Sequence, residues 1–437
     1  MLTLLLVIFI VGYLAIALEH PLKVDKTASA LLLGMLMWII YAMCAESEEA
    51  LHRILSVELI EQLGDITQTL LFLIGAMTIV ELIDVHGGFR IITDRITTRN
   101  KVKLLWIVAF VTFFLSAILD NLTTTIVMIM LLRKLVDDQM TRWLYAGAIV
   151  IAANSGGAWS PIGDVTTIML WVNGNITAPA LLTYVLLPSI VSMVVPLFFV
   201  SRWVKGELPP RVVVHEPSAY ISPKERATMF YLGVGGLIFV PIFKTITHLP
   251  PFVGMLFVLG LLWVFTECYY NRKMLDRANE HRIPTVIRRV DMPSILFFLG
   301  ILMAVGVLEV TGILGLGAQY LDEEIHNIYI IGSVLGILSS IVDNVPLVAG
   351  VMGMYPVSDP ASVGYAANFV VDGPFWELMS YCAGVGGSIM IIGSAAGVIA
   401  MGLEKINFGW YLKRFSWLAL VGYFCGIAVY ALEKLVF

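Results

Sequence analysis

Long apolar runs separated by short polar segments dominate this sequence. A helix needs about 20 predominantly apolar residues to cross a bilayer, with a range of roughly 17 to 25. Runs close to this length predict transmembrane helices at residues 1–18, 28–44, 66–84, 143–172, 180–200, 228–243, 252–270, 292–313, 376–403 and 410–433. The pattern therefore predicts an all-α polytopic membrane protein with about ten full transmembrane helices.

Two more apolar elements, residues 104–132 and 326–354, are each divided by an Asp-Asn pair. In the first element, 16 residues precede Asp120 and 11 follow Asn121. At about 1.5 Å per residue these limbs extend roughly 24 and 16 Å, whereas the hydrocarbon core is about 30 Å thick. Because the second limb is too short to cross, we expect both elements to be re-entrant hairpins with their tips inside the membrane.

Two of the predicted transmembrane helices contain glycine-rich interruptions. Residues 154–164 read NSGGAWSPIGD, and residues 385–394 read VGGSIMIIGS. Proline and paired glycines disfavour a regular helix, and irregular backbone at membrane depth is tolerated only against protein or around a cavity. We therefore expect two broken helices whose interrupted backbone borders a binding site.

The two halves of the chain resemble each other. The matching segments are LFLIGAMTIVELIDVHGG (71–88) with LFFLGILMAVGVLEVTGI (296–313), SAILDN (116–121) with SSIVDN (339–344), and SGGAWSPIGDVTT (155–167) with VGGSIMIIGSAAG (385–397). Each half has three spans, a hairpin, a broken helix and a final span. Since five full crossings is an odd number, we expect the second copy to be inverted, an arrangement typical of secondary transporters. The predicted units are a first repeat at 1–204, a cytoplasmic linker at 205–227 and a second repeat at 228–437.

The distribution of charge agrees with a membrane protein. Only 14% of the 437 residues are charged, whereas soluble domains carry about a quarter. With both hairpins in place, all of the 27 Lys and Arg residues except Arg53, Lys244 and Lys434 fall on one side of the membrane. This asymmetry places that side in the cytoplasm and both termini outside. The four cysteines form no CxxC pair, which argues against a metal or redox centre.

Three acids lie where hydrocarbon would otherwise surround them. Asp120 and Asp343 occupy the hairpin tips, and Asp164 follows the break at Pro161 and Gly163. An ionised side chain at membrane depth is costly and usually functional, so we expect these acids to bind cations or protons. Asp is also a good helix cap; Asp120 can serve both roles, and a purely structural cap is the alternative for Asp343.

Neutral ligands are expected among the amides and hydroxyls next to these acids. Back-bonding to helix carbonyls and small-residue packing are the alternative roles for them. The sequence predicts that Asp120, Asp164 and Asn154 bind sodium. In the second half, Ser394 stands at the position of Asp164, so the two halves are not equivalent. The other candidate ligands are Asn121, Thr123, Thr124, Ser155, Ser160, Thr166, Thr167, Asn344 and Ser388.

Further ionisable residues lie near the ends of predicted spans. These residues are Glu81, Asp84, His86 and Glu309. They either take part in a proton path or pH sensing, or are simply solvated at the membrane interface, and both alternatives are open. His20, His248 and His326 lie at similar edges, where a packing role is the alternative.

Four motifs stand out: EHPLKVDKTASALL (19–32), DNLTTT (120–125), NSGGAWSPIGDVTT (154–167) and DNVP (343–346). With them the chain resembles NhaD-type sodium/proton antiporters of the ion transporter superfamily over nearly its whole length. The resemblance implies exchange of cytoplasmic Na⁺ and Li⁺ for external H⁺ in a bacterial cytoplasmic membrane, by a homodimer with elevator-like motion. We expect no resident cofactor and no nucleic-acid partner.

The residues by themselves favour a related mechanism. Burial and a like-charged neighbour both favour the protonated form of a carboxylate, so Na⁺ and H⁺ would compete for the same oxygens at Asp120 and Asp164. A sodium-coupled dicarboxylate carrier and an arsenite or antimonite permease of the same superfamily stay open. Three buried acids with no intramembrane Lys or Arg disfavour an anionic substrate. No nucleophile–base pair or metal cluster indicates an enzyme.

Overall fold

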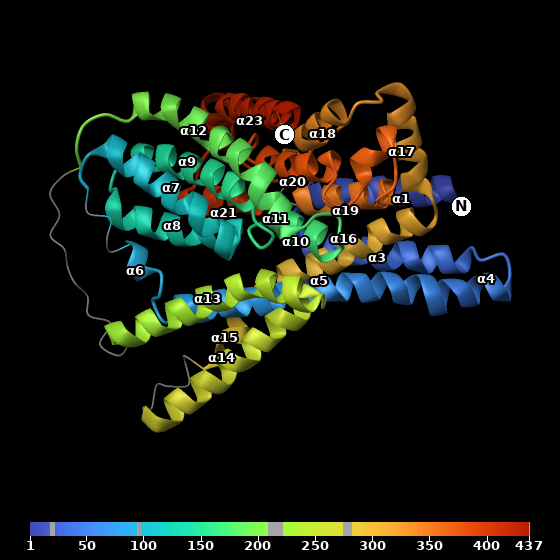
Figure 1. The fold of residues 1–437 in the computed structure, drawn as a ribbon, viewed down its shortest axis with the longest axis horizontal. Coiled ribbons are helices and arrows are strands. Elements are labelled where there is room, and N and C mark those ends of the chain that lie inside the picture. Colours follow the sequence, from blue (N-terminus) through green and yellow to red (C-terminus); the bar gives the residue numbers. More distant parts are fainter. Residues whose placement is uncertain are drawn as a thin grey trace.

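The computed structural model describes residues 1–17, 22–93, 96, 98–208, 222–273, 282–341 and 343–436. In this part of the chain the fold is helical, and β-structure is confined to one isolated bridge between Asn100 and Glu207. Eight helical segments here are long and apolar enough to cross a membrane. The structure therefore confirms the predicted all-α membrane class (Figure 1), while the number of full crossings stays a prediction.

The long helices form two groups that pack against each other (Figure 1). The scaffold group contains α1 (Leu2–Ala17), α3 (Lys26–Met43), α5 (Leu59–Val85), α13 (Pro223–Thr247), α14 (Pro251–Lys273) and α16 (Met292–Val310). The broken-helix group contains α7 (Lys101–Leu119), α8 (Asn121–Leu135), α9 (Gln139–Gly157), α10 (Val165–Val172), α12 (Leu186–Trp203), α18 (Ile328–Leu338), α19 (Asn344–Met354), α20 (Pro374–Gly386), α21 (Ala395–Glu404) and α23 (Trp417–Val436). At the boundary, α10 packs on α5 and α19 packs on α16.

Short helical elements connect or extend the long ones. They are α4 (Glu48–Arg53), η1 (Ile54–Glu58), α6 (Arg90–Thr93), α11 (Ala178–Ala180), η2 (Leu181–Val185), α15 (Ile283–Val286), η4 (Ile287–Arg289), α17 (Ile313–Glu324), η5 (Gly364–Phe369), α22 (Phe408–Tyr411) and η6 (Leu412–Ser416).

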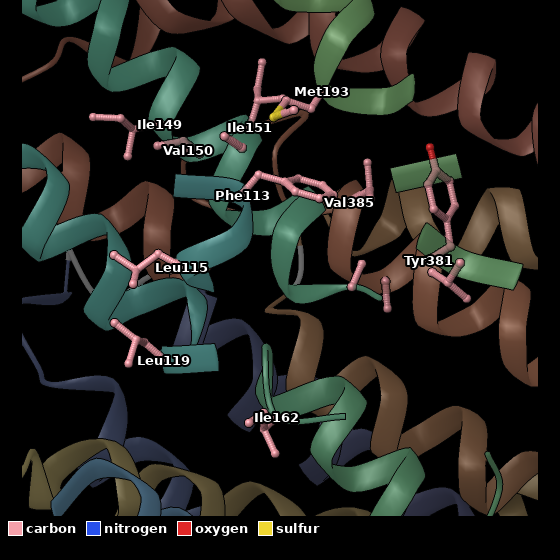
Figure 2. Close-up of a cluster of buried hydrophobic side chains, with 14 of the residues drawn as sticks. Phe113, Leu115, Leu119, Ile149, Val150, Ile151, Ile162, Met193, Tyr381 and Val385 are labelled. Atoms are coloured by element: carbon pink, nitrogen blue, oxygen red, sulfur yellow. The ribbon is translucent and has the colours of Figure 1, made fainter. Parts of the chain in front are cut away.

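The interior of the broken-helix group is a close-packed apolar core. Figure 2 shows part of it, with Phe113 of α7, Ile149 and Ile151 of α9, Met193 of α12 and Val385 of α20. Each of these side chains is at most 2% exposed. Lipid tails are as apolar as these side chains, so helix association in a membrane depends on tight packing more than on the hydrophobic effect.

The helix breaks in the broken-helix group occur at the positions that the sequence indicated. They fall at Asp120, at residues 158–164, between the end of α18 at Leu338 and the start of α19 at Asn344, and at 387–394. Asp120 has φ 80° and ψ 158°, a backbone conformation that costs a non-glycine residue on the order of 1–3 kcal/mol. Capping offsets part of this cost, because the Oδ1 atom of Asp120 accepts a hydrogen bond from the amide of Thr123 at 2.8 Å.

Contacts at equivalent positions in the two halves correspond. The hydroxyl of Ser116 donates to the carbonyl of Ala153 at 2.6 Å, and the hydroxyl of Ser339 donates to the carbonyl of Ala383 at 3.0 Å. Ser116 and Ser339 begin the aligned hairpin motifs, and Ala153 and Ala383 stand two residues before the aligned Gly-containing segments. These contacts support the prediction of two repeats, and their opposite insertion in the membrane stays a prediction.

Two regions are more helical than the apolar pattern indicated. Residues 48–85 form one helical run of 38 residues, where the sequence predicted a span only at 66–84. The run begins at Glu48, and the preceding Ser47 caps α4 by accepting from the amide of Ala50 at 3.1 Å. The helix α17 also lies outside the predicted elements. It buries only Ala318, and a helix on the surface needs no continuous apolar run.

Candidate functional site

Asp164 lies at the centre of a buried polar cluster. The residue is only 1% exposed. The carboxylate caps α10, because Oδ1 accepts from the amide and the hydroxyl of Thr166, both at 2.9 Å. Asn121 at the first hairpin tip donates from Nδ2 to Oδ2 at 2.5 Å, and Asn344 at the second tip donates from Nδ2 to the two oxygens at 3.3 and 3.4 Å. Both hairpin tips therefore contact one carboxylate.

Asn154 joins this cluster to the second broken helix. Its Oδ1 atom accepts from Nδ2 of Asn121 at 3.2 Å, and its Nδ2 atom lies 3.0 Å from Oγ of Ser388 and 2.8 Å from Oγ of Ser394. A primary amide has two N–H donors and a carbonyl oxygen with two lone pairs, so both donors of Asn154 are used and its oxygen can accept one further contact. The hydrogen bonds orient the carbonyl of Asn154 towards the first hairpin and link residues far apart in the sequence.

A cavity of about 70 Å³ borders the cluster at the boundary between the two helix groups. All three predicted acids, Asp120, Asp164 and Asp343, line it, together with Asn121 and Asn344. Its opposite walls are mainly apolar and come from α5 and α16 of the scaffold group. Carboxylate and amide oxygens are ligands that hard cations prefer, and the volume is sufficient for such an ion or for a few water molecules.

A lysine of the scaffold group also faces this cavity. The Nζ atom of Lys26, at the start of α3, lies 3.3 Å from Oδ2 of Asp343 and 4.6 Å from the ring centroid of Phe297. The expectation that no Lys or Arg accompanies the three acids is therefore wrong. Lys26 was assigned to a cytoplasmic loop because it precedes the apolar run, and only the packing of α3 beside α16 brings it to the second hairpin tip.

Comparisons with known proteins place the chain in a family. The citrate transporter family, CitMHS, matches residues 5–371. Sodium/proton antiporter 2 of Arabidopsis thaliana is 43% identical over 97% of both chains. The Na⁺/H⁺ antiporter NhaD of Vibrio cholerae is 31% identical over 98% of this chain and 91% of that protein.

The chain belongs to the NhaD-type sodium/proton antiporter family. The resemblance indicated by the sequence motifs is thus confirmed. Because the family and the relatives named above are transporters, the expectation that the chain is not an enzyme is confirmed as well. The crystal structure of the YdaH transporter of Alcanivorax borkumensis has the same overall fold, with a TM-score of 0.55, 11% identity and coverage of 93% of this chain and 97% of that one.

Other predicted ligands of this NhaD-type chain are engaged in structural contacts. Ser155 accepts from the hydroxyl of Ser192 at 2.9 Å, and Ser160 donates to the carbonyl of Ala117 at 2.5 Å. Thr123 donates from its hydroxyl to Asp120 at 3.0 Å, so it orients that carboxylate. Thr167 completes the cap of α10, because its Oγ1 atom accepts from the amide of Asp164 at 3.3 Å. These residues shape the site and do not line the cavity in the described part of the chain.

Thr124 differs from these residues. It is fully buried, and its hydroxyl makes no hydrogen bond within the described residues. It does not line the cavity. The structure therefore gives Thr124 neither the predicted contact with the acids nor the alternative bond to a helix carbonyl.

The residues proposed for proton movement or pH sensing lie away from this cavity. Glu81 is 3.9 Å from Arg289, Asp84 is exposed, and Glu309 accepts from Gln62 at 3.2 Å. His20 lies outside the described residues.

His86 is completely buried, although the sequence placed it at a membrane edge. Its Nδ1 atom lies 2.6 Å from the carbonyl of Leu82, and its Nε2 atom lies 2.6 Å from the hydroxyl of Tyr270. Tyr270 in turn donates to Glu225 at 2.7 Å. These contacts connect α5, α13 and α14 inside the scaffold group.

The broken-helix group contains a buried ion pair that the sequence motifs did not predict. Glu377 of α20 is 0% exposed, and its Oε2 atom lies 2.7 Å from Nζ of Lys434 and accepts from the hydroxyl of Tyr430 at 2.7 Å. An acid inside the apolar run at 374–386 is itself a signal of a buried partner, and it would have identified Glu377. The pair connects α20 to the C-terminal helix α23.

We expect Lys26→Gln and Asp343→Asn to change the rate of antiport by similar, small amounts. The two side chains are about 32% and 23% exposed, and ion pairs with this exposure contribute roughly 0.2–1 kcal/mol, which corresponds to less than about fivefold in rate. The double variant should be no worse than either single one, because both changes remove the same contact. Initial exchange rates in membrane vesicles measure this. Complete loss of exchange in Asp343→Asn alone would show that Asp343 binds the transported ion directly.

Proposed function

We propose that this protein exchanges Na⁺ for H⁺ across a membrane and that Asp164 and Asp120 are the shared binding groups. The observation that carries the proposal is the buried carboxylate of Asp164, which both hairpin tips contact beside a cavity. In the structure, amide donors hold this carboxylate. A Na⁺ ion or a proton at the same oxygens would neutralise it.

Competition for the same oxygens is the proposed source of coupling. A buried carboxylate is stabilised by either a cation or a proton, and it is costly to move through a low-dielectric barrier while ionised. If only the neutralised site changes its exposure, each Na⁺ that leaves on one side requires protons to return. Asn154 would supply a neutral oxygen, and Asn121, Asn344 and the backbone freed at the helix breaks would adjust to the occupant.

The boundary between the helix groups supports an elevator-like motion. The site belongs to the broken-helix group, and the cavity wall opposite it consists mainly of apolar residues of α5 and α16. Such a wall forms few specific polar contacts and would permit the broken-helix group to slide along the scaffold group. Lys26 and Asp343 form an ion pair across this boundary, and it would have to break during the motion.

The ion selectivity, the direction of exchange, the oligomeric state and the topology are proposed from the sequence. Transport of Li⁺ as well as Na⁺, outward movement of the metal ion against external H⁺, a homodimer and both termini outside are parts of this proposal. A bacterial cytoplasmic membrane is proposed from the family resemblance, and the sodium/proton antiporters of Arabidopsis thaliana show that relatives also occur in plants.

A carrier of carboxylate anions is the second candidate. Two observations favour it: the matching family is described as citrate transporters, and Lys26 places a positive charge at the cavity. Three carboxylates line the same cavity, however, and Lys26 is already paired with one of them. An anion would meet net repulsion there, so Na⁺/H⁺ exchange is the better fit.

Everted membrane vesicles containing the full-length protein test the proposal. With an imposed acidic interior reported by a pH-sensitive dye, addition of Na⁺ or Li⁺ should cause rapid alkalinisation, and addition of K⁺, citrate, succinate or arsenite should not. Vesicles without the protein are the control. Citrate uptake that depends on Na⁺, without cation-driven proton movement, would replace the proposal by the second candidate.

A further inference from the structure

A second cavity, of about 220 Å³, lies at the boundary between the two helix groups. Residues of α5, α10, α16 and α19 line it, and residues of the same four helices line the cavity beside Asp164. On α5 the lining residues change from Ala76 in the first cavity to Asp65 in the second, and on α16 they change from Phe297 to Glu309. At about 1.5 Å per residue these steps correspond to roughly 16–18 Å. The two cavities therefore follow one another along one boundary.

The second cavity is lined by oxygen-bearing side chains of α5, of α16 and of the segment that follows α10. Asp65 and Glu309 contribute carboxylates, and Gln62, Thr69 and Asn175 contribute neutral polar groups. No Lys or Arg is among the described residues that line it. Gln62 donates from Nε2 to the Oε2 atom of Glu309 at 3.2 Å, which holds that carboxylate in place and leaves its other oxygen available.

Two of these polar side chains line the cavity without a hydrogen-bond partner among the described residues. Thr69 is 3% exposed and Asn175 is 4% exposed, and within the described residues neither side chain forms a hydrogen bond, although both line the cavity. An amide or hydroxyl in the protein interior is stabilised by a hydrogen-bond partner. Their orientation into a polar cavity indicates that a ligand or its hydration water completes their hydrogen bonding.

We propose that this cavity is a second Na⁺ site, at which the ion docks with part of its hydration shell. Two carboxylates with neutral oxygens suit a hard cation, and a volume of this size accommodates an ion together with several waters. The inference rests on the proposed Na⁺/H⁺ exchange: an ion that leaves Asp164 would dock between Asp65 and Glu309 before release. In the predicted topology this end of the boundary faces the outside.

Sodium-ion NMR relaxation on the purified full-length protein tests the site directly. Binding to the protein increases the relaxation rate of the sodium nucleus, which we call Na⁺-dependent relaxation. We expect the Asp164→Asn protein, in which the first site lacks its charge, to retain this effect. Adding Asp65→Asn and Glu309→Gln should reduce that remaining effect at least about fivefold, because both charged ligands are lost. Glu323→Gln, an exposed acid on α17 outside the cavity, is the matched control and should change nothing.

Two results would overturn the second site: loss of all Na⁺-dependent relaxation in Asp164→Asn alone, or its persistence after Asp65 and Glu309 are both neutralised. Thermal unfolding of every variant verifies that it is folded. If a variant does not fold, exchange by the Glu309→Gln protein is measured in vesicles instead. The Na⁺ concentration that gives half-maximal exchange should then increase, and only when Na⁺ is added from the side that the second cavity faces. An equal increase from both sides would contradict the proposal. Absence of Na⁺/H⁺ exchange by the unmodified protein in vesicles would refute the proposed function separately.

Discussion

Replacing Asp164 by Asn should abolish Na⁺-driven proton movement. Asparagine caps helices as well as aspartate does, so α10 should keep its hydrogen bonds with Thr166. The charge is lost, and the new amide would place its own N–H donors near those of Asn121 or Asn344, which now donate to the carboxylate. Loss of a charged ligand costs on the order of 3 kcal/mol, which corresponds to about a 100-fold lower exchange rate.

Asp138→Asn is the matched control for this prediction. Asp138 caps α9 by accepting from the amide of Thr141 at 2.8 Å, in an exposed position. The same chemical change there keeps the cap and should leave exchange unaffected. Dye-reported alkalinisation of everted vesicles, normalised to the amount of folded protein, measures both variants. Normal exchange by Asp164→Asn, or by the companion variant Asp120→Asn, would mean that the transported ions bind elsewhere.

Gly156→Ala should strongly destabilise the fold. A Cβ at this position would collide with the backbone carbonyl of Phe113, at the point where α9 crosses α7. Overpacking costs about 1–3 kcal/mol where side chains can move, and a backbone carbonyl cannot move without shifting its helix. We therefore expect a loss at the upper end of that range, about 3 kcal/mol, and displacement of the first hairpin from Asp164.

Other glycines allow this expectation to be checked. Gly386 stands at the aligned position of the second half and faces the carbonyl of Gly336, so Gly386→Ala should be equally damaging. A Cβ at Gly235 in α13 would meet no heavy atom within 4 Å, and Gly235→Ala should stabilise the helix by roughly 0.5–1 kcal/mol. Thermal unfolding of the purified proteins compares all three. Similar unfolding temperatures for Gly156→Ala and Gly235→Ala would show that α7 and α9 separate more easily than the structure indicates.

The two halves contribute unequally to the proposed site. The first half supplies Asp164, Asn121 and Asn154, whereas the second half supplies Asn344 and two serines that bind Asn154. Ser394 stands where the first half has Asp164, and it caps α21 through the amide of Gly397 at 3.2 Å. The cap is therefore common to both halves, and the buried charge belongs to the first half only. At these two aligned helix caps, only the first half therefore carries an acidic side chain.

Much of the architecture could be predicted from local patterns. Apolar runs indicate membrane helices because hydrocarbon offers no hydrogen-bond partners, and the breaks at Asp120 and at Gly163 follow from residues that disfavour helix or cap it well. The buried acid at Asp164 was identifiable for the same reason. Each of these inferences depends only on residues close together in the chain.

The tertiary structure decided which polar groups meet. Lys26 and Asp343 are 317 positions apart, and Asn154 reaches Ser388 and Ser394 from the other half of the chain. No local pattern in the sequence encodes these contacts, because they depend on how whole helices pack. By itself, the sequence determined a membrane protein with interrupted helices and buried acids. Only the packing of α3, α5 and α16 against the hairpin tips determined the two cavities and the ion pair at their boundary.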